Sequence, residues 1–276
     1  MTLQSNPELK SLNLNLLEEQ AKQTRRLIIE VAHRSQSAHV GSSLSCVDIL
    51  IALYFHQMHI VESDWQNRDI FITSKAHAAM ALYATLTLKG VISPEQFFSY
   101  NQNDGALPSH LDRFTSKGIE TSTGALGHGF NIGLGIAHGL KLQDSQRQVY
   151  SLIGDGETME GSIWEGAMFA PKLKLDNFTA FMDYNKLQGY GSSTELCQFE
   201  PIVEKWEAFG WEVLRINGHN FSELISALQA PHCGRPKIII ADTIKGKGVS
   251  FMENEMKWHY FLVSDQIKDQ ALAELT

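Results

Sequence analysis

The chain has 276 residues, of which 43% are hydrophobic and 20% charged, so its composition is that of an ordinary globular protein and its length allows one large α/β domain. Its formal net charge of −8 argues against a nucleic-acid partner, because domains that bind nucleic acids usually carry a basic stripe. No apolar run approaches the length that spans a membrane, and the polar N-terminus lacks the pattern of a secretory signal.

The first half of the chain predicts mainly helices. They are expected over 12–35, 45–56 and 76–89 and again from Pro94, with a short buried strand at 69–73. Ser45, with Asp48 three positions on, resembles the N-terminal cap of the second helix. The stretch from Asn101 to Gly127 has the character of a loop, and a loop of that length inside a compact domain is usually functional.

The second half alternates regularly between strands and helices. Strands are expected at 148–154, 178–184, 211–217 and 236–243, and helices at 127–143, 158–171, 201–210 and 221–229. This alternation predicts an α/β fold with a parallel sheet that is flanked by helices on both faces. Because no linker or internal repeat interrupts the chain, we expect residues 1–276 to form a single domain.

The most informative segment is Gly154-Asp155-Gly156, which follows a strand, together with Asn185 at the end of the next strand. Parallel strands point the same way, so Asp155 and Asn185 are expected at the same carboxyl edge of the sheet. A carboxylate and an amide oxygen are hard ligands that suit magnesium or calcium. The two glycines allow a phosphate group to approach the backbone closely. The segment therefore predicts a metal-bridged diphosphate site.

A glycine-rich run extends from Thr123 to Gly135. A dinucleotide-binding fingerprint would need a strand directly before the glycines, but residues 120–123 are polar. Gly124 and Gly127 flank the turn and are better candidates for close backbone approach to a ligand, whereas Gly133 and the later glycines fit helix packing.

Five of the eleven histidines stand in loops or at the ends of predicted elements: His39, His77, His110, His128 and His259. None shows the spacing of a zinc site. Any one of them taken alone is more often structural than catalytic. As a group, loop histidines can bind phosphate and hydroxyl oxygens and move protons near neutral pH.

Three further charged residues are candidates for the site. Lys245 stands in a basic, glycine-rich loop after the last strand, which either holds an anion or is a solvated turn. Glu157 lies in the first turn of a helix, where an acid is favoured by the positive helix end. Glu160 lies beside it and could instead reach an interface or take part in proton transfer.

With these motifs in their order, the chain resembles the N-terminal, thiamine diphosphate-binding region of transketolases from about residue 20 to residue 260. The motifs that carry the resemblance are 154–161 together with 183–185, the turn 121–127, Asn67-Arg68-Asp69 leading to His77, and the loop 245–248. The chain departs from the family's usual pattern at Ala125, His128, Lys75-Ala76 and Tyr260. Because the loop of His259 and Tyr260 faces the acceptor channel in that family, the bulky Tyr260 argues against the ordinary sugar-phosphate substrate.

The resemblance implies a set of site residues. Asp155, Asn185 and the backbone carbonyl of Leu187 would hold magnesium, or calcium or manganese in its place, against the diphosphate. The candidates for cofactor binding are His77, Gly124, Leu126, Gly154, Gly156, Glu157, Asn185, Lys245 and His259. The candidates for catalysis are His39, His110, His259 and Glu160. Of these, His39 and His110 match residues that contact hydroxyls of the transferred two-carbon unit, and Glu160 matches an acid near the subunit contact.

The resemblance also implies a two-chain enzyme. A complete transketolase carries a pyrimidine-binding domain and a C-terminal domain, which we expect on a separate partner chain, in a dimer of heterodimers. The reaction would move a two-carbon ketol unit from a ketose to an aldehyde, both sugars or sugar phosphates. Two alternatives remain open: the α-chain of another thiamine diphosphate enzyme, such as a 2-oxoacid dehydrogenase, and a non-catalytic cofactor-binding or regulatory subunit.

The three cysteines, Cys46, Cys197 and Cys233, are far apart and outside any metal-ligand spacing. Such cysteines fit a reducing compartment, so we expect a cytoplasmic protein.

Overall fold

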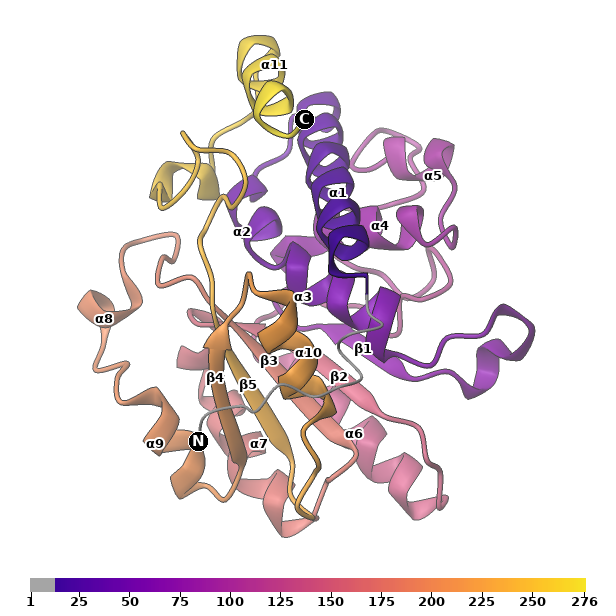
Figure 1. The fold of residues 1–276 in the computed structure, drawn as a ribbon, viewed down its shortest axis with the longest axis vertical. Helices are drawn as coiled ribbons and strands as arrows, with labels where there is room; N and C mark the ends of the chain where they lie inside the picture. Colours follow the sequence, from indigo (N-terminus) through magenta and orange to yellow (C-terminus); the bar gives the residue numbers. More distant parts are fainter. Residues whose placement is uncertain (1–12) are drawn as a thin grey trace.

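A five-stranded parallel sheet forms the centre of the molecule in the computed structural model, which describes residues 13–276 (Figure 1). The strands are β1 (Ile70–Thr73), β2 (Val149–Gly154), β3 (Phe178–Tyr184), β4 (Glu212–Asn217) and β5 (Lys237–Asp242). Their order across the sheet is β1-β2-β3-β5-β4, and every neighbouring pair is parallel. All five carboxyl ends therefore meet at one edge, as the alternating sequence pattern predicted.

Helices surround the sheet. The α-helices of the described chain are α1 (Leu14–Ser35), α2 (Val40–Ser45), α3 (Val47–Ala52), α4 (Ala79–Leu88), α5 (Pro94–Phe98), α6 (His128–Leu142), α7 (Gly161–Lys172), α8 (Ser193–Leu196), α9 (Ile202–Ala208), α10 (Phe221–Gln229) and α11 (Asp265–Glu274). Shorter turns are π-helical at Leu53–Gln57 and 3₁₀-helical at Glu62–Asn67, Ala76–Ala78, Glu157–Met159 and Met256–His259. None of the helices described here is long and apolar enough to cross a membrane.

Each face of the sheet is covered by its own hydrophobic core. Successive strand residues point to opposite faces, so Phe71 and Leu152 pack with α1, α3, α4 and α10, whereas Ile72 and Ile153 pack with α6, α7 and α9. Strands that are buried on both faces read as continuous apolar runs, which explains why β1, β2 and β3 are fully buried. The predicted α/β class with helices on both faces is confirmed.

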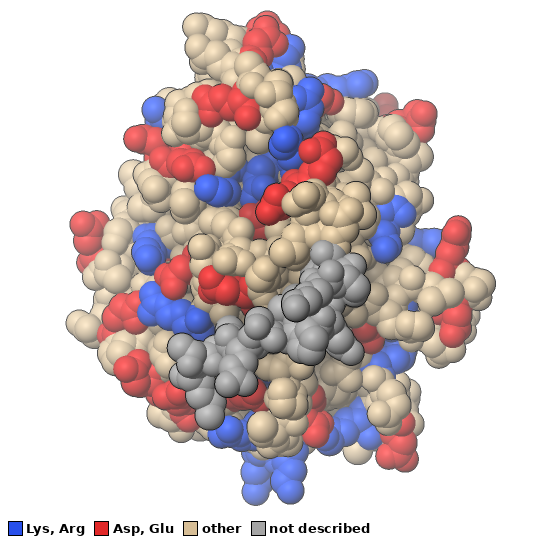
Figure 2. All heavy atoms as spheres, in the orientation of Figure 1, with Lys and Arg blue, Asp and Glu red and all other residues tan. Residues whose placement is uncertain are grey.

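The charged surface carries no single-sign stripe on the face that Figure 2 shows, where acidic and basic side chains are interspersed.

Most predicted elements are present with shifted ends. The predicted first helix began at Leu12, which lies outside the described residues, and the described part of it is α1. The loop from Asn101 to Gly127 contains neither helix nor strand, as expected. The short helices α2, α8 and α11 were not predicted.

The prediction that Ser45 caps a helix is wrong. Ser45 is the last residue of α2, and a break at Cys46 separates α2 from α3. The Ser45 hydroxyl instead donates a hydrogen bond of 2.6 Å to Oδ2 of Asp183, a residue of β3. A tertiary contact therefore replaces the local one that the spacing suggested.

Asp48 is the centre of a buried ionic contact that joins α1 to α3. Arg25 donates two hydrogen bonds to its carboxylate, at 3.0 Å and 2.6 Å, and Nδ1 of His219 lies 2.6 Å from Oδ2. Nε2 of His219 accepts from the N–H of Ile244, so Nδ1 must carry the ring proton. Burial works to raise the pKa of Asp48, but Arg25 and His219 outweigh it and hold the pKa below its ordinary value.

We expect Asp48→Asn to lower the free energy of unfolding at pH 7 by about 1.5–3 kcal/mol, the range for hydrogen bonds to charged groups. Because the pKa of Asp48 is lower in the folded state, its contribution is present above about pH 4 and is lost as the pH falls toward its folded pKa. Urea unfolding at pH 7, 5 and 3 should therefore show a smaller acid-induced loss for the variant than for the wild type. The exposed Asp144→Asn is the control and should follow the wild type. Parallel pH profiles for wild type and Asp48→Asn would refute this role.

Candidate active site

A cavity of about 480 Å³ lies at the carboxyl edge of the sheet and gathers nearly all of the predicted site residues. The predicted residues that line it are His39, His77, His110, Gly124, Leu126, Gly154, Asp155, Gly156, Glu157, Glu160, Asn185, Leu187 and His259. Lys245 lies behind this lining and contacts two of its members. Segments that are far apart in sequence therefore converge on one site.

Asp155 and Asn185 occupy neighbouring positions because β2 and β3 are paired strands. Asp155 is 3% exposed and Asn185 is 5% exposed. Oδ1 of Asp155 accepts from the N–H of Gly156 at 2.9 Å, and Oδ2 accepts from the hydroxyl of Ser193 at 2.6 Å. Burial raises the pKa of Asp155, so a cation at this carboxylate would compensate the cost of its burial.

The oxygen atoms of this corner suit a hard divalent cation. The Asp155 carboxylate, the Asn185 amide oxygen and the Leu187 carbonyl are the donor types that Mg²⁺ and Ca²⁺ prefer. No group of three His, Cys, Asp or Glu side chains within residues 13–276 could hold a metal by itself. A cation at this corner would thus complete its shell with oxygens of a ligand and of water. The residues present fit a metal bound together with a diphosphate.

Three glycines near the cavity stand where a larger residue would meet a neighbouring side chain or fill space. A Cβ atom on Gly156 would come within 3.0–3.1 Å of the Gln188 side chain, and one on Gly124 would meet only His110, at 3.7 Å. Gly127 has a φ of +80°, and a Cβ atom there would lie 2.3 Å from the Ser162 hydroxyl oxygen. Gly127 is therefore required by the turn itself and Gly156 by the close Gln188 side chain, whereas Gly124 leaves open space for a ligand.

The Glu157 carboxylate connects separate segments of the chain that border the cavity. Its carboxylate accepts hydrogen bonds from the N–H of Gly127 at 2.8 Å, from the N–H of Gly154 at 3.2 Å and from the hydroxyl of Ser74. Burial raises the pKa of this carboxyl group. Both oxygens have protein partners, so Glu157 joins the end of β2 to the turn before α6.

Three histidine rings form a cluster on one side of the cavity. The ring centroids of His39 and His259 are 5.1 Å apart, those of His39 and His77 5.3 Å, and those of His77 and His259 5.5 Å. Burial, followed by neighbouring charges, lowers the pKa of His39 to about 4 and that of His259 to about 3, and it lowers the pKa of His77 well below the ordinary value. All three rings are therefore neutral at pH 7, and each offers one donor and one acceptor.

The other two loop histidines differ from the cluster. His110 is exposed in the loop after α5, lines the cavity and has Nδ1 3.3 Å from the Ser109 hydroxyl. His128 begins α6, and its Nδ1 lies 3.2 Å from the carbonyl oxygen of Leu126. Because His128 is not among the residues that line the cavity, its contact is local to the turn.

Lys245 is fully buried, so its alternative interpretation as a solvated turn lysine is wrong. Its ammonium group donates to the Leu187 carbonyl at 3.0 Å and lies 2.9 Å from Nδ1 of His259. An ammonium group has no acceptor, so Nδ1 of His259 accepts and Nε2 carries the ring proton. Burial, followed by the neighbouring charge of Lys75, lowers the pKa of Lys245 to about 8.

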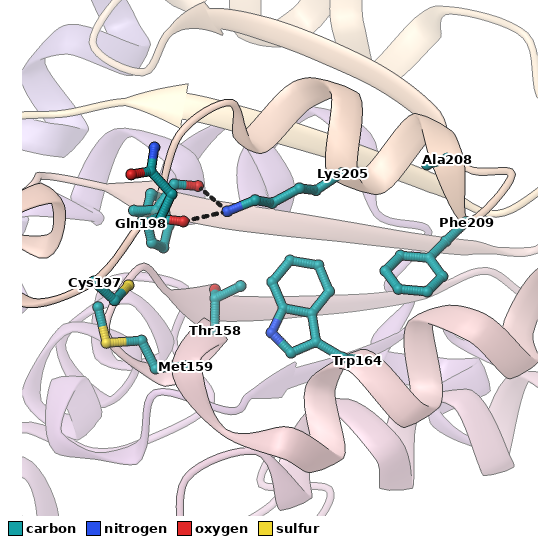
Figure 3. Close-up of a pocket in the computed structure, with 9 residues that line it drawn as sticks. Thr158, Met159, Trp164, Cys197, Gln198, Lys205, Ala208 and Phe209 are labelled. Carbon is teal, nitrogen blue, oxygen red and sulfur yellow. Dashed lines mark hydrogen bonds between the residues drawn. The ribbon is translucent and has the colours of Figure 1, made fainter.

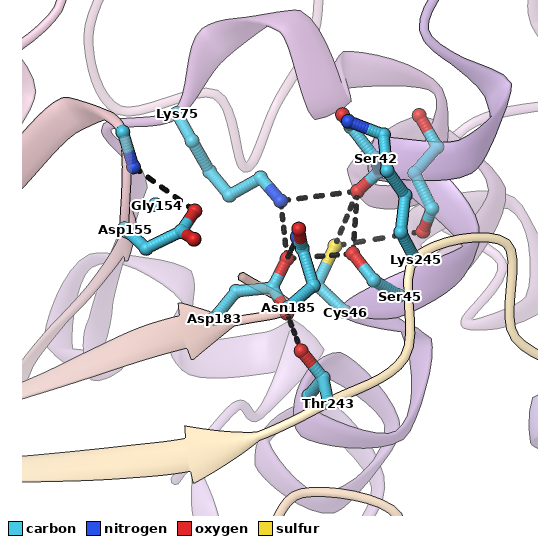
Figure 4. A network of polar contacts seen from close by, with 12 residues as sticks. Ser42, Ser45, Cys46, Lys75, Gly154, Asp155, Asp183, Asn185, Thr243 and Lys245 are labelled. Atoms are coloured by element: carbon cyan, nitrogen blue, oxygen red, sulfur yellow. Dashed lines mark hydrogen bonds and ion pairs between the residues drawn. The ribbon is translucent and has the colours of Figure 1, made fainter. Parts of the chain in front are cut away.

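An ion pair of Lys75, which lines the cavity, and Asp183, which lies beneath it, was not predicted from the sequence (Figure 4). Lys75 is 1% exposed and Asp183 is fully buried. Burial works to raise the pKa of Asp183, but Lys75 and several hydrogen bonds hold it below the ordinary value. The available signal was a lysine two positions after the apolar strand β1, where a buried charge requires a partner.

A second cavity of about 540 Å³ lies next to the site and shares Met159 with it (Figure 3). Its walls include Trp164 and Phe209. The ammonium group of Lys205 donates to the backbone carbonyls of Gln198 and Phe199, so it is already satisfied. This cavity is apolar and lacks the titratable cluster of the first one.

Comparison with known proteins decides the family. The model of the transketolase, thiamine diphosphate binding domain matches residues 17–271. The chain belongs to the transketolase family. The predicted resemblance is thereby confirmed, and the family favours transketolase over the alternative of a 2-oxoacid dehydrogenase α-chain.

Relatives of this transketolase chain include separate subunits of similar length. The 6-deoxy-6-sulfo-D-fructose transketolase subunit SqwG of Clostridium sp. (strain MSTE9) is 42% identical over 263 residues, which cover 94% of this chain and 96% of the relative. An apulose-4-phosphate transketolase subunit of Phocaeicola vulgatus is 37% identical, with 96% and 95% covered. Human transketolase is 33% identical, and the match covers 95% of this chain but only 42% of the human protein.

Solved structures agree with this assignment. The crystal structure of transketolase from Campylobacter jejuni superposes with a TM-score of 0.89 at 33% identity and covers 96% of this chain and 43% of that one. The chain therefore has the fold of the diphosphate-binding part of a longer transketolase.

Proposed function

We propose that this chain is the N-terminal subunit of a two-chain, thiamine diphosphate-dependent transketolase that transfers a two-carbon ketol unit from a ketose to an aldehyde. The observation that carries the proposal is the convergence of Asp155, Asn185 and the histidine cluster on one cavity at the carboxyl edge of the sheet. The similarity to separate transketolase subunits over nearly their whole length supports it.

In this proposal Asp155, Asn185 and the Leu187 carbonyl hold Mg²⁺, or Ca²⁺ or Mn²⁺ in its place, against the diphosphate. Gly154 and Gly156 would let the diphosphate approach the backbone, and His77, His259 and Lys245 would donate to its oxygens. Gly124 and Leu126 would border the rings of the cofactor. Thiamine diphosphate, once bound, supplies the nucleophilic carbon and the electron sink of the reaction.

The remaining side chains handle the substrate. His39, His110 and His259 bind the hydroxyl groups of the ketose and move its protons. The rings of His39 and His259 are neutral at pH 7, so each offers one donor and one acceptor for this purpose. Lys245 holds the proton of His259 on Nε2, and His259 can donate from that atom. Glu157 keeps the cavity walls in place, and Glu160 lies at the rim, where it can reach the partner subunit.

We expect His110→Ala to impair turnover while cofactor binding is largely kept, because His110 is exposed at the mouth of the cavity and has no bond to the metal corner. Loss of one acid–base or hydroxyl contact is expected to lower kcat by roughly 10²–10⁴-fold. Titration of thiamine diphosphate by protein fluorescence measures binding, and a coupled assay of the assembled enzyme measures kcat. His128→Ala, which lies outside the cavity lining, is the matched control and should keep both. Equal kcat values for His110→Ala and wild type would remove His110 from the mechanism.

We propose that this chain supplies the diphosphate-binding domain of the enzyme, and that a partner chain carries the pyrimidine-binding and C-terminal domains in a dimer of heterodimers. Support comes from relatives that are named as transketolase subunits and that match this chain over 95–96% of their own length. A cytoplasmic location stays a prediction from cysteine use.

The substrates are proposed to be sugars or sugar phosphates. The transketolase relatives are named for 6-deoxy-6-sulfo-D-fructose and apulose-4-phosphate. Tyr190 and Tyr260 line the cavity, and both are strongly exposed. We propose that these two phenol rings border the entry of the acceptor, which would favour an acceptor that differs from the family's usual one.

Reconstitution tests the proposed function. The chain is purified alone, and then together with the polypeptide encoded beside it, and ketol transfer is measured with thiamine diphosphate and Mg²⁺. We expect no turnover from the chain alone and turnover from the mixture, which should be lost in His39→Ala. Full activity of the isolated chain would refute the two-chain model. A mixture that retains its activity with His39→Ala would instead favour a non-catalytic subunit.

A further inference from the structure

The carboxylate of Asp183 collects four side-chain donors below the active-site cavity (Figure 4). Oδ2 accepts from the Lys75 ammonium group, from the Ser45 hydroxyl at 2.6 Å and from Nδ2 of Asn185 at 3.3 Å. Oδ1 accepts from the hydroxyl of Thr243. The ends of β1, β3 and β5 and the helix α2 are thereby joined at one buried point.

This carboxylate determines which way the amide of Asn185 faces. An ionised carboxylate can only accept hydrogen bonds, so the NH₂ group of Asn185 must point to Asp183. The amide oxygen then points away from it, where it accepts from the N–H of Leu187 at 3.1 Å. A flipped amide would set its oxygen against the carboxylate and lose the contact with Leu187. An asparagine at position 183 would not impose this orientation on Asn185, because the amide group of an asparagine offers both a donor and an acceptor.

Lys75 offsets the free-energy cost of burying the Asp183 carboxylate. A fully buried carboxylate without a cation is strongly unfavourable, and the Lys75 ammonium group neutralises Asp183 at direct contact. The ammonium group also donates to the carbonyl of Ser42 at 3.1 Å. Lys75 also lines the cavity, but two of its three N–H donors are used by Asp183 and Ser42.

We propose that the buried Lys75–Asp183 ion pair is a positioning device that fixes the amide oxygen of Asn185 toward the cavity and thereby sets the affinity for the divalent cation. The inference rests on the proposed function, because it requires Asn185 to bind that cation. Residues that orient metal ligands from behind typically change metal affinity 10–100-fold when they are replaced.

The test is the double variant Lys75→Met with Asp183→Leu, which removes both charges at similar volume and leaves neither one unpaired. Replacement of a whole buried ion pair by apolar residues is often neutral for stability. Calorimetric titration of Mg²⁺ in the presence of saturating thiamine diphosphate should give a Kd that is raised roughly 10–100-fold over wild type. Circular dichroism on the same samples reports the fold and the melting temperature.

A matched control uses a second buried ion pair, which Arg25 of α1 forms with Asp48 of α3. The double variant Arg25→Met with Asp48→Leu also loses a buried pair, but neither residue lines the cavity. It should bind Mg²⁺ like the wild type. An equal loss of Mg²⁺ affinity in both double variants would mean that the loss follows from general destabilisation of the fold, and this would overturn the inference.

The outcomes separate the inference from the proposed function. Wild-type protein that does not bind Mg²⁺ with thiamine diphosphate refutes both. Wild-type binding together with a folded Lys75→Met/Asp183→Leu protein of unchanged Kd refutes the inference alone. If this variant does not fold, the wild type can be used to test whether the Asn185 amide is fixed. Its side-chain NH₂ signal is observed in a ¹H–¹⁵N spectrum and is assigned by its absence from the spectrum of Asn185→Asp. Slow hydrogen exchange of that NH₂ group supports the fixed amide, and exchange as fast as that of a surface asparagine overturns it.

Discussion

Asp155→Ala is expected to abolish the metal-dependent binding of thiamine diphosphate. Asp155 is the single carboxylate among the proposed metal ligands, so its loss leaves only neutral oxygens for a divalent cation. Without the cation, the diphosphate and the buried polar corner would lack their main neutralising charge. Fluorescence titration with thiamine diphosphate, with Mg²⁺ and then with EDTA, should show a large metal-dependent gain for wild type and none for the variant.

Two further variants serve as comparisons for Asp155→Ala. Asp176→Ala removes a carboxylate next to the opposite end of β3, where it pairs with Lys141, and should bind the cofactor like the wild type. Ser193→Ala keeps the Asp155 carboxylate but removes its 2.6 Å hydrogen bond, so we expect an intermediate loss. Normal cofactor binding by Asp155→Ala, with the same response to EDTA as wild type, would show that the metal corner is assigned wrongly.

The largest effect on stability is expected for Lys75→Met alone. This change leaves the Asp183 carboxylate fully buried without its cation, and removal of one partner of a buried ion pair typically costs about 3–5 kcal/mol. Most small domains are stable by only about 5–15 kcal/mol, so a substantial part of the folding free energy would be lost. Urea unfolding at pH 7, followed by circular dichroism, measures the difference.

Burial explains why Lys75 should differ from other paired lysines. Lys141 pairs with Asp176 at the surface, where both side chains are more than one-third exposed, and such pairs contribute about 0–1 kcal/mol. Lys141→Met is therefore the matched control and should change stability by less than about 1 kcal/mol. A loss of that small size for Lys75→Met would mean that the ion pair contributes little to the fold.

The sheet and the proximity of Asp155 to Asn185 could be predicted from the sequence because each depends on local patterns. Apolar runs that alternate with amphipathic segments specify a parallel sheet, and a parallel sheet brings the ends of β2 and β3 together. Asp155 and Asn185 follow those two strands directly, so their placement needed no knowledge of distant contacts.

Other features could not be predicted because they depend on contacts between distant parts of the chain. Lys75 and Asp183 are 108 positions apart, and Ser45 is 138 positions from the carboxylate that it contacts. Spacing within a segment suggested a helix cap for Ser45 and a solvated turn as one alternative for Lys245. Both interpretations failed because tertiary packing buries these side chains against partners that no local pattern indicates.

The histidine cluster could be predicted from the sequence only in part. Its members, His39, His77 and His259, were selected because they stand in loops, but the sequence alone could not tell that their rings lie within 5.1–5.5 Å of one another. Their low pKa values follow from burial, which only the folded chain produces.

The most direct test of the account is an anomalous diffraction experiment on crystals of the chain soaked with thiamine diphosphate and Mn²⁺ in place of Mg²⁺. The account predicts one strong manganese peak at roughly 2.0–2.3 Å from a carboxylate oxygen of Asp155, the amide oxygen of Asn185 and the carbonyl oxygen of Leu187, with diphosphate oxygens completing the shell. A manganese peak elsewhere, or cofactor density that leaves Asp155 and Asn185 without contact to a metal, would contradict it.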